Sequence, residues 1–275
     1  MESQPVITVD NATKVFESAR GPVEALGGFN LQVKEGEFVT IVGPSGCGKS
    51  TLLWAMAALW PLTGGSIKIY GQEVRTPRRE VGMVFQQANL LPWRDLMGNV
   101  HFAFEIMREK VKDHQHRIDK LIEVTQLSGF EHHYPRELSG GMQQRASIVR
   151  ALSPDPKVLL MDEPFGALDA FTRDEMNVML LELWEQTRKT IVFVTHSIQE
   201  AVYLSDRVYV MTPRPGRNSR VYDIPLGRPR PLSVTTERRF FDIFGEIKQQ
   251  IYDDVEEAAK SGEYEIDRYS RVSGG

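Results

Sequence analysis

Residues 43–50 read GPSGCGKS, and they join the apolar stretch Phe38–Val42 to a segment with helical spacing, Lys49–Leu59. The stretch matches the pattern GxxxxGK[ST], in which glycines let backbone N–H groups turn toward a phosphate at the start of a helix. The lysine then reaches the β- and γ-phosphates, and the serine hydroxyl ligates Mg²⁺. A glycine-rich turn without a ligand is a poor alternative, since all eight positions match in the right context. We therefore expect a nucleoside triphosphate to bind here.

Every residue of this loop is a candidate ligand of ATP, and so is Thr51, whose hydroxyl can reach the α-phosphate. The loop residues are Gly43, Pro44, Ser45, Gly46, Cys47, Gly48, Lys49 and Ser50. We expect Cys47 to be a small filler that makes the loop sensitive to thiol reagents, with no redox role.

A second apolar stretch, Lys157–Met161, ends in two adjacent acids, Asp162 and Glu163. Carboxylates at the carboxyl end of a strand lie where ligands of open α/β sheets bind. We expect Asp162 to contact Mg²⁺, directly or through water, and Glu163 to accept a proton from the attacking water. Two such acids alone are more often a solvated turn. Together with the loop they predict a nucleoside triphosphatase.

The pattern around these motifs predicts a mainly parallel, doubly wound α/β sheet whose sequence is interrupted by helices. Strand-like and helical segments alternate over residues 157–211, whereas residues 6–87 are rich in short strand-like segments. Residues 99–151 have helical spacing with charged faces, which indicates an inserted helical lobe. Prolines follow Met211 and break regular structure, and residues 240–255 then predict one amphipathic helix.

The composition is that of an ordinary globular protein of 275 residues, 41% hydrophobic and 25% charged. The 33 Lys and Arg against 37 Asp and Glu give a net charge of −4, which argues against a nucleic-acid partner. The longest apolar run, Leu52–Trp60, is too short to span a bilayer. One cysteine excludes an internal disulfide, and residues 1–10 lack the pattern of a secretory signal. These features fit the cytoplasm.

Residues 138–145 read LSGGMQQR and lie between the two phosphate motifs. The physical interpretation is a helix start, in which Ser139 caps the helix and two glycines expose backbone N–H groups to an anion; a simple cap is the alternative. The stretch resembles the signature of the ABC ATPases and has the same place in the motif order. In that family it binds the γ-phosphate of a nucleotide held by the other subunit. The resemblance implies that Ser139, Gly140 and Gly141 bind ATP across a head-to-tail dimer.

Further residues match that family in order. Gln86 resembles the glutamine that contacts Mg²⁺ and the water, and Asp169 resembles the D-loop aspartate that communicates across the dimer. His196 resembles the switch histidine at the γ-phosphate, although a histidine after a strand is usually a satisfied surface or core group. Phe16 resembles the aromatic residue that stacks on adenine, with an ordinary core Phe as the alternative. The implied catalytic residues are Glu163, His196, Lys49 and Gln86, and the implied Mg²⁺ ligands are Ser50, Gln86 and Asp162.

The resemblance covers residues 6–225. It implies a P-loop NTPase (RecA-like) core, an N-terminal antiparallel β subdomain and an inserted helical subdomain that carries the signature, at about residues 88–152. We expect residues 1–225 to form the ABC ATPase domain. Residues 226–275 would form a C-terminal tail with an amphipathic helix that covers the core or a neighbouring copy.

Looser segments resemble importers of nitrate, sulfonate, taurine and related small molecules. The segments are residues 86–94, 162–169, 172–174 and 211–217. Trp93 and Arg94 would lie beside the groove that receives a coupling helix of the membrane subunit. A lobe-packing tryptophan and a solvated arginine are the alternative.

The predicted function is that of an ATP-hydrolysing subunit, which couples ATP binding, dimer closure and hydrolysis to uptake of a small solute. The expected cofactors are ATP and Mg²⁺. The expected partners are a second copy of this or a homologous ATPase subunit, transmembrane permease subunits and, indirectly, a solute-binding protein, but no nucleic acid. The permease would hold the chain at the cytoplasmic face of the inner (plasma) membrane.

Two alternatives remain open at this point. One is the ATPase of an exporter or lipid extractor, because the same engine drives both directions. The other is a soluble ABC clamp or assembly factor, against which the acidic charge and the lack of a second cassette argue. The transported solute cannot be read from this chain.

Overall fold

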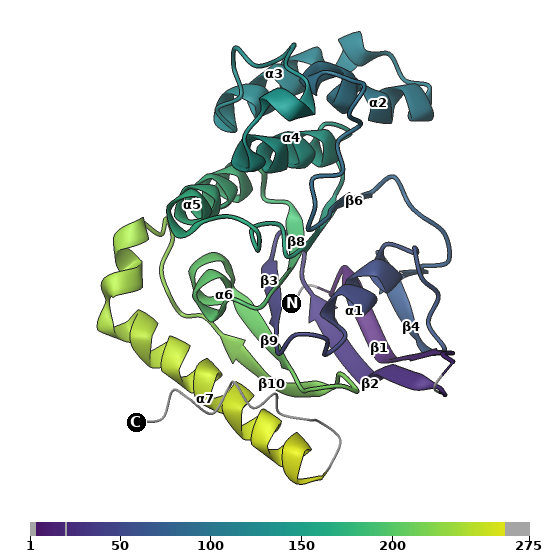
Figure 1. The fold of residues 1–275 in the computed structure, drawn as a ribbon, viewed down its shortest axis with the longest axis vertical. Coiled ribbons are helices and arrows are strands. Elements are labelled where there is room, and N and C mark those ends of the chain that lie inside the picture. The colour runs from purple at the N-terminus through teal and green to yellow at the C-terminus, as the bar shows by residue number, and fades with distance from the viewer. Residues whose placement is uncertain (1–3, 20, 262–275) are drawn as a thin grey trace.

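The computed structural model describes residues 4–19 and 21–261, which form two sheets and a helical lobe (Figure 1). The smaller sheet is antiparallel and has the order β2 (Val23–Val33), β1 (Ile7–Phe16), β4 (Gly64–Ile69), β5 (Gln72–Glu73). The larger sheet has the order β10 (Asn218–Asp223), β9 (Arg207–Met211), β3 (Phe38–Val42), β8 (Thr190–Thr195), β7 (Val158–Asp162), β6 (Val81–Val84). All neighbours in it are parallel except β10 and β9. The predicted parallel sheet is thereby confirmed.

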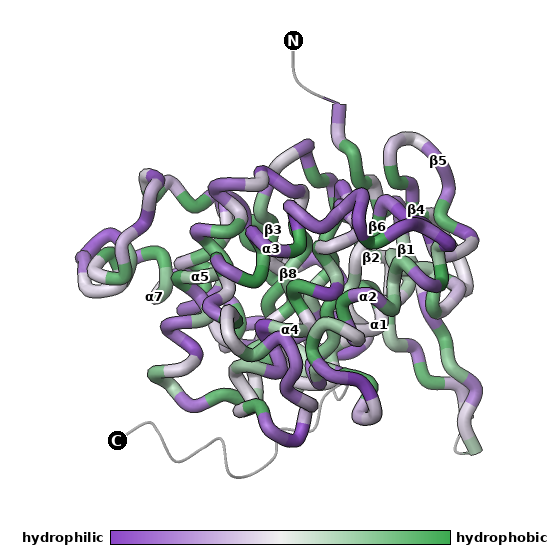
Figure 2. The backbone as a smooth tube through the Cα atoms, turned by 90° about the horizontal axis from the view of Figure 1, so that it is seen from above, coloured by the Kyte–Doolittle hydropathy of each residue, from purple (hydrophilic) through white to green (hydrophobic). Residues whose placement is uncertain are grey.

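The central strands β3, β7 and β8 are buried along their whole length, because both faces of the sheet are covered. Alternate residues of β3 pack into two separate hydrophobic cores. Val39 and Ile41 pack with α1 (Lys49–Met56) and the antiparallel sheet. Phe38 and Val42 pack with the core that includes α5 (Ala170–Thr187) and α6 (Ile198–Leu204). In Figure 2 the green, hydrophobic stretches accordingly gather around β3 and β8 in the interior.

The helical lobe lies beyond the β6 side of the large sheet (Figure 1). It contains α2 (Leu96–Met107), α3 (Gln115–Val124), α4 (Gly140–Leu152) and the short 3-10 helices η1 (Val111–His114) and η2 (Pro135–Glu137). Asp95 caps α2 by accepting a hydrogen bond from the Gly98 N–H. The helix α4 packs against α2, α3, α5 and β6, so it connects the lobe to the sheet.

The C-terminal part forms the 3-10 helix η3 (Leu232–Thr236) and the long helix α7 (Arg238–Lys260). Phe240 and Ile247 are buried, and α7 packs against α6, β9 and β10. The predicted amphipathic helix is therefore present, while the end of the predicted tail lies outside the described residues. Within residues 4–19 and 21–261, no helix combines the length and the apolar character that crossing a membrane requires.

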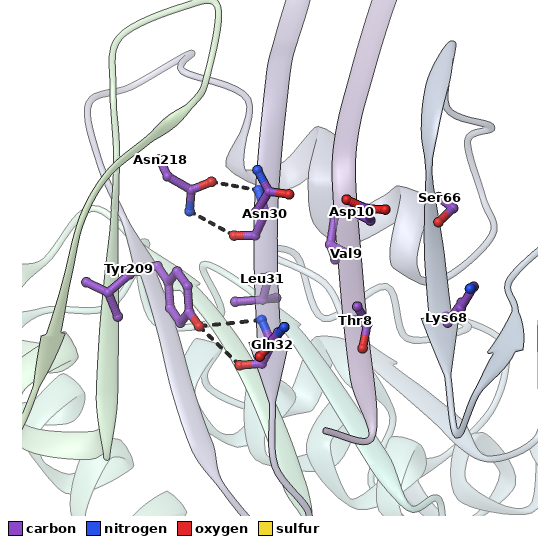
Figure 3. Close-up of a pocket in the computed structure, with 11 residues that line it drawn as sticks. Thr8, Val9, Asp10, Asn30, Leu31, Gln32, Ser66, Lys68, Tyr209 and Asn218 are labelled. Atoms are coloured by element: carbon purple, nitrogen blue, oxygen red, sulfur yellow. Dashed lines mark hydrogen bonds between the residues drawn. The ribbon is translucent and has the colours of Figure 1, made fainter. Parts of the chain in front are cut away.

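The free edge of β2 is held by side chains from the other sheet (Figure 3). The Asn218 side chain donates to the carbonyl of Asn30 and accepts from its N–H, at 2.8 and 2.6 Å. The Tyr209 hydroxyl does the same with Gln32, at 3.1 and 3.4 Å. These bonds satisfy backbone groups that an edge strand would otherwise leave open. The same side chains line a groove of about 650 Å³ between the sheets.

Three sequence-based element bounds are wrong. The sequence pattern predicts the strand β2 only from Phe29 on, because Gly27 and Gly28 lower strand propensity, whereas β2 starts at Val23. The helix α1 ends at Met56 and not at Leu59. The strand β10 was expected to be irregular, since it follows prolines and is polar; it is an edge strand whose side chains are mostly outside the core.

Candidate active site

A cleft of about 400 Å³ opens beside the loop 43–50, which connects β3 to α1. It is lined by Phe16, Val23, Ala25, Gly46, Gly48, Lys49, Ser50, Thr51, Trp60, Glu163 and Arg214. The fold thus brings three residues of the antiparallel sheet, the start of α1 and the end of β7 to one place. Several of the residues predicted from separate motifs share this cleft.

The loop conformation requires glycine at two positions. Gly46 and Gly48 have φ values of +74° and +111°, which side-chain-bearing residues rarely adopt. A Cβ atom on Gly48 would also lie 2.6 Å from the carbonyl oxygen of Ala25. Gly48 is the N-cap of α1 and has no side chain to satisfy the first-turn N–H groups. The start of α1 therefore offers free N–H donors and a positive dipole end to an anion.

Lys49 places a buried cation within the loop. Its side chain is 4% exposed, and its Nζ donates to the carbonyls of Gly43 and Pro44, each at 2.9 Å. The nearest carboxylate is that of Glu163, with an Nζ to Oε1 distance of 3.7 Å. A buried cation with few charged partners favours a further anion such as a phosphate.

Ser50 and Asp162 place two oxygen groups side by side. The Ser50 hydroxyl donates to Asp162 Oδ1 at 2.7 Å, and the Trp54 indole N–H donates to Asp162 Oδ2 at 2.8 Å. Burial raises the pKa of the Asp162 carboxyl, and these two hydrogen bonds oppose the rise. Mg²⁺ usually takes few protein oxygens and completes its shell with water and phosphate. The chemistry of this pair therefore fits Mg²⁺.

Glu163 and His196 meet at the carboxyl edge of the sheet. Glu163 Oε2 lies 2.9 Å from His196 Nδ1. The two residues follow adjacent parallel strands, in which Asp162 of β7 pairs with Val194 of β8. Glu163 has a φ of +43°, which is unusual for a residue with a side chain and is typical of strained functional positions.

Aromatic side chains form one wall of the cleft. The rings of Phe16 and Trp60 meet edge to face with centroids 5.2 Å apart, and Lys14 Nζ lies 4.9 Å from the centre of the Phe16 ring. Phe16 is only half-buried, so part of its surface is available to a ligand. The sequence pattern did not single out Trp54, Trp60 or Arg214. Each had a weak signal: both tryptophans lie in the apolar run that ends at Trp60, and Arg214 lies in the importer-like segment 211–217.

The signature residues lie elsewhere. Ser139 caps α4 by accepting from the Met142 N–H at 3.2 Å. Gly141 lets α4 approach α5, because a Cβ atom there would lie 2.9 Å from the Thr172 methyl group. In the described chain, none of residues 139–141 lines the cleft, and Figure 1 shows α4 in the helical lobe, apart from α1. One copy of the chain therefore does not bring its signature to its own loop.

Two other candidates are not joined to the cleft. Gln86 is exposed just after β6, and no described residue forms a hydrogen bond with its side chain. Asp169 caps α5, accepting from the Thr172 N–H at 3.1 Å and from its hydroxyl at 2.7 Å. The Thr172 backbone bond lowers the pKa of the Asp169 carboxyl. This capping contact was not expected from the sequence.

The structure argues against the prediction of a thiol-sensitive loop. Cys47 is buried, and burial raises the pKa of its thiol. A buried thiol that resists ionisation reacts poorly with thiol reagents. The expectation of a small filler agrees with the structure, since a Cβ atom at Gly43 would lie 3.1 Å from Cys47 Sγ.

The sequence model of the family described as "ABC transporter" matches residues 26–166. The chain belongs to the ABC transporter family. The expected family, fold class and ATPase activity are thereby confirmed. The matched range includes the loop, the signature and the acids at the end of β7, whereas Phe16 and His196 lie outside it.

Three relatives match this ABC protein over most of their length. An uncharacterised ABC transporter ATP-binding protein of Methanocaldococcus jannaschii is 49% identical over 82% of this chain and 84% of its own. An aliphatic sulfonates import ATP-binding protein of Bacillus cereus is 42% identical over 91% and 96%. A taurine import ATP-binding protein of a Jannaschia species is 43% identical over 84% and 86%.

A solved structure of an ATP-binding cassette is also similar. It is dimeric and holds ADP and phosphate in a post-hydrolysis state. This chain and a chain of that solved structure superpose with a TM-score of 0.70 and are 33% identical. The match covers 80% of this chain and all of the chain in the solved structure.

Proposed function

We propose that this ABC protein is the ATP-hydrolysing subunit of an importer for a small solute of the sulfonate or taurine kind. The observation that carries the proposal is the cleft itself, which Lys49, Ser50 and Glu163 line. Asp162 is hydrogen-bonded to Ser50, and His196 is hydrogen-bonded to Glu163, at its edge. The named import subunits among the relatives favour an importer over an exporter or a soluble clamp.

The loop and the start of α1 hold the triphosphate. Their free N–H groups and Lys49 Nζ surround the β- and γ-phosphates, Thr51 reaches the α-phosphate, and Phe16 covers the adenine with help from Trp60. Ser50 and Asp162 would hold Mg²⁺, and Gln86 would be a further ligand. Bound Mg²⁺ supplies charge neutralisation for the phosphates.

Glu163 and His196 act on the water and the γ-phosphate. Glu163 accepts the proton of the attacking water, and its hydrogen bond with His196 holds both side chains at one edge of the γ-phosphate site. The 3.7 Å separation between Glu163 and Lys49 keeps the base close to the cation that binds the transferred phosphate. Lys49 then stabilises the charge that develops during transfer.

A second copy completes the site. Ser139, Gly140 and Gly141 of one copy bind the γ-phosphate held by the other, and Asp169 lies at the junction between them. Their separation from the cleft within one chain supports this arrangement, and so does the dimeric state of the similar cassette. Closure over two ATP molecules then drives the transport cycle, and hydrolysis reopens the dimer.

The helical lobe docks the membrane subunits. Trp93 is 70% exposed just before α2, which is unusual for so large an apolar side chain. The neighbouring Arg94 is fixed by two hydrogen bonds to Glu105, at 2.7 and 2.9 Å, and by the Phe102 ring. An exposed tryptophan beside a fixed arginine suits an apolar helix of a permease, which would hold the chain at the cytoplasmic face of the inner membrane.

The division into a domain of residues 1–225, with a helical subdomain at about 88–152, and a tail of residues 226–275 belongs to the same proposal. The contacts of α7 with α6, β9 and β10 support a tail that covers the core of its own chain.

Reconstitution tests the proposal. The chain is combined with its permease subunits and solute-binding protein in liposomes, and ATP hydrolysis is measured with and without an alkanesulfonate or taurine. Solute-stimulated hydrolysis is expected. Hydrolysis that no such solute stimulates would contradict the importer assignment, and an absence of all hydrolysis would contradict the ATPase assignment.

A further inference from the structure

An arginine on α5 joins the two loops that flank the catalytic pair. The Arg173 guanidinium donates to the Leu168 carbonyl at 2.8 Å and to the Phe165 carbonyl at 3.4 Å. Both carbonyls belong to the segment between Glu163 and Asp169. Because the guanidinium is planar and has several N–H donors, one side chain can hold two carbonyls of a loop in fixed positions.

The same guanidinium reaches a buried carboxylate on α6. Arg173 Nε lies 3.6 Å from Glu200 Oε1, and Glu200 is only 3% exposed. The other carboxylate oxygen of Glu200 accepts a hydrogen bond from the Thr195 hydroxyl, which in turn accepts from the Ser197 N–H at 3.0 Å. These contacts fix the residues on both sides of His196. A buried carboxylate so close to an arginine is held in place, since each would be costly to leave unpaired.

The contacts form a closed path. It runs from the Phe165–Leu168 carbonyls through Arg173, Glu200 and Thr195 to His196, and returns through the 2.9 Å contact between His196 and Glu163. A movement of the Asp169 segment would therefore change the position of His196 relative to Glu163.

We propose that Arg173 and Glu200 are positioning residues that set the Glu163–His196 geometry and couple it to the segment preceding Asp169. The inference rests on the proposed function, because it assumes that Glu163 and His196 act in hydrolysis. Neither Arg173 nor Glu200 lines the cleft in the described chain. They act through the catalytic pair and not on the nucleotide.

This role predicts loss of turnover without loss of nucleotide binding. We expect Arg173→Met and Glu200→Gln each to lower kcat of ATP hydrolysis by about tenfold or more, since small displacements of catalytic groups have effects of this size. The KM for ATP should stay within about twofold, because the loop at 43–50 is untouched. Arg173→Lys, which keeps the charge but not the planar fork, should fall between wild type and R173M.

A double variant and a matched control sharpen the test. The R173M/E200Q double variant should be no slower than the slower single variant, because both changes break the same path. The control is Arg79→Met, which removes another arginine–glutamate pair, with Arg79 Nη1 and Glu109 Oε1 2.9 Å apart. Neither residue of this pair lines the cleft or contacts Glu163 or His196 in the described chain. The control variant should keep the wild-type kcat.

The folding of each variant is checked by thermal melting. In an E163Q background, ATP-dependent dimerisation is also measured, and it should persist.

Folded R173M and E200Q variants with kcat within about twofold of wild type would overturn the inference alone. Loss of ATP-dependent dimerisation together with kcat would also overturn it, since that pattern indicates a general structural role. If R173M does not fold, R173K and E200Q decide in the same way. A wild-type chain with no turnover above E163Q would overturn the proposed function and the inference together.

Discussion

Trp54 positions the carboxylate of Asp162 from the same helix that carries Ser50. Its indole N–H donates to Asp162 Oδ2 at 2.8 Å, so Trp54→Phe leaves one oxygen of a buried carboxylate with one partner fewer. We expect the Mg²⁺ concentration for half-maximal ATP hydrolysis to rise about tenfold, as is typical when a group that orients a metal ligand is removed. Titration of activity against Mg²⁺ measures the change.

Trp184→Phe is the matched control for this prediction. The Trp184 indole N–H is buried and has no acceptor in the described part of the chain, so its removal breaks no hydrogen bond. An equal Mg²⁺ shift in both variants would show that Trp54 acts through general packing.

Glu200 links the catalytic geometry to pH-dependent stability. Burial raises the pKa of its carboxyl, opposed by the Thr195 bond and by the charges of Arg173 and His196. Between the ordinary pKa of the unfolded chain and this raised value, the folded state binds more protons than the unfolded state. The free energy of unfolding therefore falls as pH rises through that window, and above it the folded chain carries the full cost of a buried carboxylate.

Glu200→Gln removes that cost. We expect the melting temperature of E200Q, relative to wild type, to increase from pH 4 to pH 8, while its kcat falls. Thermal melts across this range provide the measurement. A relative melting temperature that decreases with pH would mean that the charged form of Glu200 stabilises the fold.

Local motifs explain which site residues could be predicted. The functional residues of the loop 43–50 are neighbours in sequence, and so are the two acids at the end of β7. Their sequence spacing alone therefore indicates their chemistry. Arg214 reaches the cleft because a segment distant in sequence packs beside the loop, and no sequence spacing predicts such a contact. Arg173 and Glu200 were missed for the same reason, since their partners are carbonyls and a hydroxyl in other loops.

The spacing of apolar residues in the sequence predicts the tail helix α7, and some of the same apolar residues pack it against the rest of the chain. Ile247 is fully buried on α7, which packs against α6, β9 and β10. We expect Ile247→Ala to lower the free energy of unfolding by about 2–5 kcal/mol, through lost burial and a residual cavity. Ile106→Ala is the control, because Ile106 is exposed on α2 and its loss should change stability by no more than about 0.5 kcal/mol.

Urea unfolding followed by circular dichroism compares the two variants. An Ile247→Ala variant as stable as Ile106→Ala would mean that α7 contributes no stability to the core.

The edge strand β10, which α7 covers, could not be predicted from apolar spacing. Its residues are polar and follow prolines, so neither alternation nor propensity marks it as a strand.

The proposed dimer explains why Phe171 is exposed in a single chain, because the second copy would cover this side chain. It is 84% exposed next to Asp169, and its neighbour Thr172 packs against Gly141 of the signature. We therefore expect Phe171→Ser to weaken ATP-dependent dimerisation by about tenfold, because buried aromatic residues dominate such interfaces.

Phe241→Ser is the control, since Phe241 is exposed on α7, which carries none of the residues assigned to the shared site. Analytical ultracentrifugation with ATP, in a hydrolysis-deficient background, measures the dimer constant. Equal dimer constants for the Phe171 variant and the control would place the interface elsewhere.

The motif order predicted the fold class and the family, but it could not show that the signature is far from the loop in one chain. That separation depends on how the inserted lobe packs on the sheet through α4. It is also what makes a second copy necessary for the proposed mechanism.

The central claim is that Glu163 activates water in a site completed by a second copy. The most direct measurement compares wild type and Glu163→Gln by light scattering after size exclusion with ATP and Mg²⁺, together with phosphate release. We predict that E163Q forms a stable dimer with two ATP bound and releases almost no phosphate. An E163Q variant that hydrolyses ATP at the wild-type rate, or that stays monomeric with ATP bound, would contradict the account.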